Sequence, residues 1–167
     1  MAIDPSEAPT NEPSHQDAVD ACKELVKKIE QSLSAIKQTG QFHAEDGQDA
    51  RAALAAVADC MGADASKFTL VFMGTRPSAV DVISLAQHVS KTVVQFTAWC
   101  AAVSIICPAF HREVEAAAEP VLTGMKCIVE RVLELNLERE PEPALVGQVH
   151  KTVEAFKRFP ATEAAAV

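Results

Sequence analysis

Histidines with charged neighbours are the first residues in this sequence whose types and spacing could do chemistry. His88 and Lys91 stand three positions apart, as a phosphoryl-accepting histidine and a supporting cation would on one helical face. His43, followed by Glu45 and Asp46, offers nitrogen and oxygen ligands of the kind that a metal ion binds. Solvated polar residues produce both patterns more often than functional sites do. We therefore expect no catalytic residue, no metal site and no cofactor.

A di-iron motif and a reactive thiol are the other chemistries that the residue types allow. A di-iron bundle needs two Glu-x-x-His pairs on facing helices, and the pair with this spacing is Glu12 and His15, separated by a proline. Cys100 and Cys107 lie seven positions apart without a basic neighbour that would favour the thiolate. Glycine-rich phosphate loops and nucleophile elbows are missing from the sequence. We expect the five cysteines to be reduced core thiols and the protein to be no enzyme.

Length and charge restrict the architecture and the partners. A chain of 167 residues is one domain's worth, and such a chain buries roughly 68–70% of its unfolded surface without disulfides. A net charge of -8 repels the phosphate backbone of nucleic acids, so we expect no nucleic-acid partner. The first twenty residues carry only acidic charges and do not have the pattern of a secretion signal. We expect a cytoplasmic or nuclear protein.

The most apolar part of the sequence is TVVQFTAWCAAVSIICPAF, residues 92–110, which contains no charged residue. A bilayer, sister helices or another protein could bury it. A polar stripe at helical spacing runs into it: Asp81, Ser84, His88, Lys91 and Gln95. The wholly apolar part is then Phe96–Phe110, which is shorter than the roughly 20 residues that span a bilayer. We predict burial against sister helices and no membrane partner.

Apolar residues recur at three- and four-residue spacing in five segments, and this periodicity predicts helices. Ser14 and Asp17 form a capping box at the start of the first helix, and Gly40 is placed to end it. Pro120 either kinks the fourth helix or marks its true start. The predicted helices run from Ser14 to about Thr39, from Ala50 to Phe72, from Ser78 to Cys107, through the block after Pro108, and briefly from Pro143.

The segments together predict an all-α fold, an antiparallel up-and-down bundle of four long helices plus a short fifth helix. The bundle domain covers residues 14–160. Residues 1–13 hold three prolines and no apolar periodicity, so we expect a flexible acidic tail, and residues 161–167 are expected to be a flexible end or a truncation point. FTLVF, residues 68–72, is the one β-like run, and the helical stripe continues through it.

DASKFTLVFMGTRPSAVDVISL, residues 64–85, resembles the signature of the cyclin-D-binding, Maid-like protein family. In that family a helix ends at a proline-containing turn and a long helix follows. Residues 118–133 and 145–166 are similar to two further segments of the family's amino-terminal bundle, so that the resemblance covers roughly residues 15–165.

Two positions depart from the family pattern. Thr75, Arg76 and Pro77 stand where relatives have a double proline, and His150 stands where relatives have a tryptophan or a similar residue. The family's carboxy-terminal helical domain lies outside the resemblance. What that domain contributes is therefore not carried over to this chain.

The resemblance implies a non-enzymatic regulator that binds a cyclin or a signalling adaptor and restrains cell-cycle or transcription factors by sequestration. The predicted partner-binding strip lies on the third helix beyond its polar stripe and consists of Ala98, Trp99, Ala102 and Ile105. The plainer alternative is that Trp99 belongs to the core. A scaffold module resembling talin and vinculin rods, a histidine phosphotransfer protein and self-association stay open as alternatives.

Overall fold

The computed structural model describes residues 11–37, 47–106 and 111–166, and in these ranges it contains five helices and no strand. The helices are α1 His15–Ala35, α2 Gly47–Phe72, α3 Ala79–Ile106, α4 His111–Glu134 and α5 Pro143–Ala166. The predicted all-α bundle is confirmed, and FTLVF forms the end of α2. The predictions for the tail up to residue 10, for Gly40, for the loop around His43 and for Pro108 concern positions outside the described residues.

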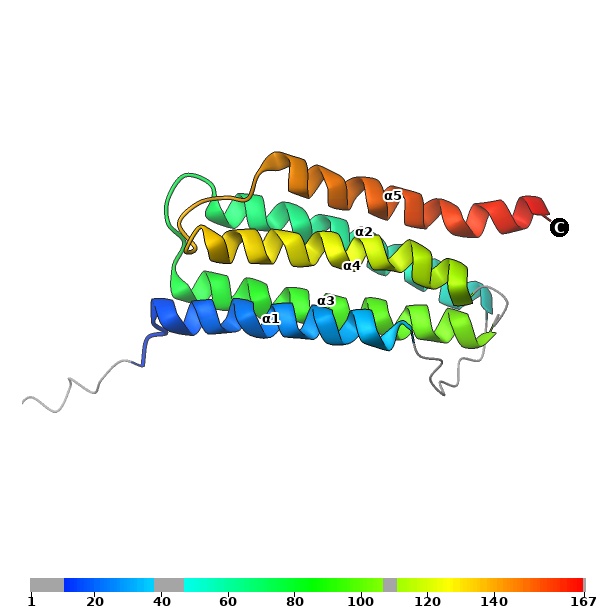
Figure 1. Cartoon of the computed structure of the whole chain (residues 1–167), viewed down its shortest axis with the longest axis horizontal. Coiled ribbons are helices and arrows are strands. Elements are labelled where there is room, and N and C mark those ends of the chain that lie inside the picture. The colour runs from blue at the N-terminus through cyan, green and yellow to red at the C-terminus, as the bar shows by residue number, and fades with distance from the viewer. Residues whose placement is uncertain (1–10, 38–46, 107–110, 167) are drawn as a thin grey trace, which may run out of the picture.

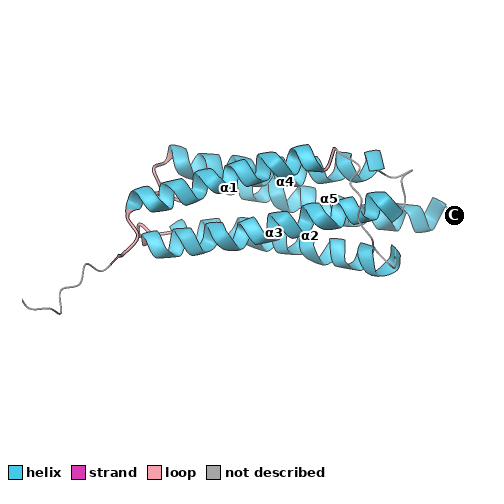
Figure 2. Ribbon diagram, turned by 90° about the horizontal axis from the view of Figure 1, so that it is seen from below, coloured by secondary structure: helices cyan, strands magenta, loops and turns pink. Residues whose placement is uncertain are grey.

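The helices lie side by side along one long axis and alternate in direction along the chain (Figures 1 and 2). Sequence neighbours are nevertheless not always spatial neighbours. Helix α1 packs against α3 and α4 and does not contact α2 within the described residues, while α5 packs against α2 and α4. As a result α1 and α3 run side by side in the same direction (Figure 1). Helix α4 contacts all four other helices.

Two helices differ in detail from the prediction, and a third follows one of the two predicted alternatives. Helix α1 ends at Ala35, earlier than expected. Pro120 lies inside α4 rather than at its start. Helix α5 has 24 residues and passes through Pro160 to Ala166, so the expected short fifth helix was wrong. A proline ends a helix only when the lost hydrogen bond and the ring clash outweigh the packing of the helix on both sides.

The buried face of α1 is also rotated from the predicted stripe. Helical spacing of the apolar residues in this segment predicts a stripe of Val19, Cys22, Val26, Ile29, Leu33 and Ile36. Of these, Cys22, Ile29 and Ile36 are buried, whereas Val19, Val26 and Leu33 are only partly buried. The other buried positions of α1 are Ala18, Leu25 and Ser32. Since α1 is covered by α3 on one side and α4 on the other, its buried face follows the direction of these two neighbours.

One continuous core runs through the bundle and contains side chains from all five helices. The rings of Phe96 on α3 and Phe156 on α5 contact each other within this core, with centroids 5.2 Å apart. Phe68 and Phe72 of α2 are 1% exposed. From Phe96 to Ser104, the part of the predicted apolar stretch whose side chains are described, every residue is buried or partly buried, so burial against sister helices is confirmed there. No helix within the described ranges has the length and apolar content to cross a membrane.

Local caps fix the ends of the helices on one side of the bundle. Ser14 and Asp17 form the predicted capping box at α1, and the Ser78 hydroxyl accepts a hydrogen bond from the Asp81 amide (3.1 Å) at α3. At the end of α4, Asn136 and Leu137 have φ of 56° and 58°. Their amides donate to the carbonyls of Leu133 and Val132, which is a Schellman motif that positions the Asn136 side chain.

Ion pairs connect helices that are distant in sequence. Lys126 of α4 pairs with Glu30 of α1 at 3.1 Å, and the hydrogen bond to Glu30 raises the pKa of Lys126. Lys157 of α5 pairs with Asp59 of α2 at 2.9 Å, and the hydrogen bond to Asp59 raises the pKa of Lys157. Both pairs are partly exposed to solvent, so each contributes little to the free energy of unfolding.

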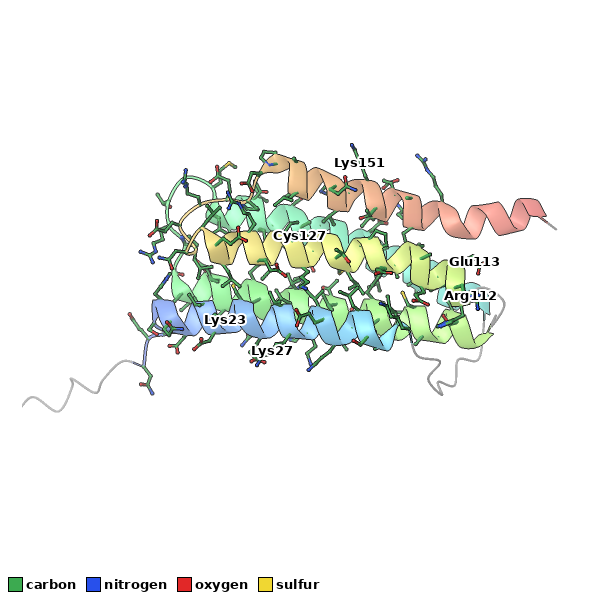
Figure 3. All side chains as sticks on the ribbon, in the orientation of Figure 1. Lys23, Lys27, Arg112, Glu113, Cys127 and Lys151 are labelled. Carbon is green, nitrogen blue, oxygen red and sulfur yellow. The ribbon has the colours of Figure 1, made fainter. Side chains whose placement is uncertain are left out.

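The cysteines are not all core residues, which corrects the expectation. Cys22 and Cys100 are buried, and burial raises the pKa of the Cys22 thiol to about 11 and that of Cys100 further. Cys60 and Cys127 are free and exposed, the latter on α4 as labelled in Figure 3. Both are on helix faces that no other helix covers, a property that residue type alone does not reveal. Cys107 lies outside the described residues.

Candidate protein-binding surface

The predicted binding strip is only partly at the surface. Ala98 and Trp99 on α3 are partly buried, and Trp99 packs against the core. Ala102 is 1% exposed, so its methyl group is covered in the folded chain. The side chain of Ile105 is outside the described part. The strip stays a prediction, and the structure offers a second surface near large exposed apolar side chains.

This second surface lies at the end of the bundle where α2 turns into α3. A pocket of about 470 Å³ opens there. Its lining comes from the end of α2, the turn and the first half of α3: Lys67, Val71, Thr75, Arg76, Pro77, Ser78, Asp81, Ser84, Leu85 and His88. The turn is possible because Gly74 has φ +86°, a conformation that suits glycine, and Ser78 then caps α3.

Exposed apolar side chains adjoin the pocket. Among the side chains that the structure describes, the exposed large hydrophobic residues are Leu70, Met73, Val80 and Val94, at 66%, 54%, 52% and 47%. Leu70 is three positions from Lys67 on α2, and Val80 is four positions from Ser84 on α3, so both stand beside the pocket lining. We call the pocket together with Leu70, Met73 and Val80 the signature face. Clustered exposed apolar residues next to a pocket are typical of protein-binding sites.

A buried carboxylate contacts two residues of the pocket lining, Lys67 and His88. The side chain of Asp64 on α2 is 1% exposed, and its Oδ1 is 2.9 Å from Lys67 Nζ and 3.0 Å from His88 Nε2. Asp64 Oδ2 is buried without a hydrogen-bond partner. Asp64 thus neutralises Lys67 and ties α2 to α3, and a buried carboxylate requires such partners.

His88 connects α3 to α2 through Asp64 and Lys67. It is in the polar stripe of α3, which is exposed as predicted at Asp81, Ser84, His88, Lys91 and Gln95. Its Nε2 is also 2.9 Å from Lys67 Nζ, so the ring joins an ordered cluster. In the part of the chain that the structure describes, no three His, Cys, Asp or Glu side chains are arranged to hold a metal ion.

The family comparison bears on the same surface. The family model described as "Grap2 and cyclin-D-interacting, N-terminal" matches residues 53–167. The chain belongs to this family. No curated protein and no solved structure is similar enough to the chain to count as a match. Membership in an interacting-protein family supports a protein-binding role, and the signature face lies wholly inside the matched region.

The sequence showed the run at residues 64–85 but not which of its side chains are exposed. The hydrophobic stripe of α2 pointed to the buried Phe68 and Phe72 and gave no sign that Leu70 and Met73 are exposed neighbours of a pocket. The spacing of Asp64 and Lys67, three positions apart, was an available signal for their ion pair. Their contact with His88, 24 positions after Asp64, had no local signal.

Proposed function

We propose that this protein is a non-enzymatic regulator that binds a cyclin or a signalling adaptor through the signature face and sequesters it. The observation that supports the proposal is that exposed apolar residues lie within the segment that resembles the family signature. Three of the exposed large hydrophobic residues, Leu70, Met73 and Val80, fall within the family signature at residues 64–85. The family description supplies the partner class, because it refers to cyclin D and Grap2.

Sequestration is a mechanism that fits a closed bundle with an exposed apolar face. Binding at such a face covers the partner and needs no chemical step. Apolar anchors at the centre of an interface supply most of the binding energy, and surrounding polar groups exclude water. Leu70, Met73 and Val80 are suited to be the anchors, and the hydroxyl and charged groups of the pocket to be the rim. The proposed compartments are the cytoplasm and the nucleus, where cyclins and adaptors act.

Two valines on α3 provide a matched test. Val80 is 52% exposed and belongs to the signature face, whereas Val94 is 47% exposed and lies outside it. Val80→Glu and Val94→Glu therefore change the same residue type at similar exposure on one helix. We expect Val80→Glu and Leu70→Glu, each as a single variant, to weaken binding to a D-type cyclin or to the Grap2 adaptor about tenfold or more, because each removes one apolar anchor. Val94→Glu should bind as the parent chain does. Isothermal titration calorimetry measures the affinities.

The controls separate binding from folding. All three variants should keep the helical circular dichroism of the parent chain, because the replaced side chains are exposed. Equal binding by Val80→Glu and Val94→Glu would place the interface elsewhere, and no binding of either partner by the parent chain would refute the proposed partner class. Ala98→Glu tests the predicted strip separately, since Ala98 is only partly buried while Ala102 is 1% exposed.

A further inference from the structure

Arg76 is a cation of the signature face that forms no ion pair with a described residue. It is exposed in the turn between Gly74 and Pro77. The neighbouring cation in the pocket, Lys67, is neutralised by the buried Asp64 at 2.9 Å. Arg76 has no carboxylate within ion-pair distance in the described ranges, although the chain as a whole carries a net charge of -8. Arg76 lines the pocket of the signature face and also a smaller pocket that contains His15, and a guanidinium without an ion-pair partner is suited to bind a carboxylate in a planar, bidentate geometry.

The guanidinium is held in one orientation by a relay of hydrogen bonds. Arg76 Nη2 is 2.8 Å from His15 Nδ1, and His15 Nε2 is 3.1 Å from Asn136 Oδ1. A guanidinium only donates hydrogen bonds, so His15 Nδ1 must be the acceptor. The proton of the neutral ring is then on Nε2, which donates to the Asn136 carbonyl oxygen. This tautomer of His15 determines which atoms of the three side chains donate and which accept.

The far end of the relay is itself fixed by the backbone. Asn136 has φ 56° and belongs to the Schellman motif at the end of α4. His15 is the first residue of α1, directly after the capping box. Arg76 is therefore supported from two helix ends that are distant in sequence. A side chain that is ordered before binding loses less conformational entropy when a ligand arrives.

The remaining donors of Arg76 select a carboxylate. In the described part of the chain its hydrogen bond goes from Nη2 to His15 Nδ1, which leaves its other N–H groups for a bidentate contact with two oxygens. A doubly charged phosphate is less suited, because the carboxylate of Asp81 lines the same pocket and repels it. A singly charged carboxylate meets less repulsion.

We infer that the signature face recognises a partner segment in which an Asp or Glu residue is flanked by apolar residues. The carboxylate contacts Arg76, and the apolar side chains contact Leu70 and Val80 on the rim and Val71 and Leu85 in the lining. This inference rests on the proposed function, since it specifies the chemistry of the partner at the same face. It does not depend on which protein supplies the segment.

A peptide array on the full chain tests the inference without a known partner. The array carries octamers of Leu, Ile, Val and Ala with one central Glu, and matched octamers with Gln or phosphoserine at that position. The fluorescently labelled parent chain should bind the Glu series about fivefold or more above the Gln series, the effect of one charge-assisted contact. Arg76→Gln should abolish this preference. Lys91→Gln, at an exposed cation of α3 outside the pocket, should keep it.

The outcomes separate this inference from the proposed function. Equal binding of the Glu and Gln series, equal effects of the two variants, or stronger binding of the phosphoserine series would each overturn the recognition of a carboxylate. If the array shows the preference for Glu while a D-type cyclin and the adaptor fail to bind, the recognition of a carboxylate is supported and the proposed partner class is refuted. If the partners bind and Val80→Glu blocks them but the array shows no preference, only the inference is refuted.

Discussion

Replacing helical glycines by alanine tests how closely α5 approaches its neighbours. An alanine Cβ at Gly124 on α4 would lie 2.9 Å from Val149 Cγ2 and 3.8 Å from Val149 Cα on α5. At Gly147 on α5 an alanine Cβ would meet nothing within 4 Å. In a helix interior, glycine is about 0.8–1.0 kcal/mol less favourable than alanine. The two sites therefore share the propensity gain but differ in steric cost.

The steric cost at Gly124 decides the sign of the effect. Val149 is β-branched, and its side chain has one strongly preferred rotamer in a helix. The methyl group has no alternative position of similar energy, so α5 has to move away from α4. Overpacking of this kind costs typically 1–3 kcal/mol. We expect Gly147→Ala to stabilise the chain by about 1 kcal/mol and Gly124→Ala to be neutral or to destabilise it by up to about 2 kcal/mol.

Urea denaturation measures this difference. Helical circular dichroism at 222 nm and the fluorescence of Trp99, the one tryptophan, should report the same transition. Gly62→Ala is an intermediate case, because its Cβ would lie 3.2 Å from the ring nitrogen of the exposed His150, and an exposed ring can shift. If Gly124→Ala stabilised the chain as much as Gly147→Ala does, the close approach of α4 and α5 would be refuted.

Three further predictions concern thiols and a helix cap. A thiol reagent should label Cys60 and Cys127 quickly and Cys22 only on unfolding, because the first two are exposed and Cys22 is buried; rapid labelling of Cys22 would contradict its burial. Since burial raises the pKa of Cys22 to about 11 from 9.0, the native state keeps a proton that the unfolded state loses, so stability falls as pH rises. At pH 11 the Cys22 thiol lowers the free energy of unfolding by roughly 2 kcal/mol. Urea denaturation at pH 8 and at pH 11 measures the decrease between the two pH values, and Cys22→Ala should make this decrease smaller by that amount. Ser14→Ala should cost about 1 kcal/mol by loss of the cap, whereas Ser14→Asp should retain it; equal unfolding midpoints for the two variants would show that the capping box contributes nothing.

The sequence predicted what depends on residues close together in the chain. Helical periodicity, the capping box of Ser14 and Asp17, the start of α3 at Ser78 and the exposed polar stripe of α3 all involve spacings of three or four residues within one helix. The physical reason is that one turn of helix brings such residues together whatever the rest of the chain does. The family resemblance at residues 64–85 was also readable without the fold.

Only the tertiary structure decided which helix covers which face. An amphipathic stripe shows that a face is buried, but it does not show that α1 is covered by α3 and α4 rather than by α2. The contacts that shape the signature face are of the same kind. Arg76 meets His15 across 61 positions, and His15 meets Asn136 across 121. Such contacts follow from packing the whole core at once, because each rotation of one helix changes which side chains its neighbours can bury.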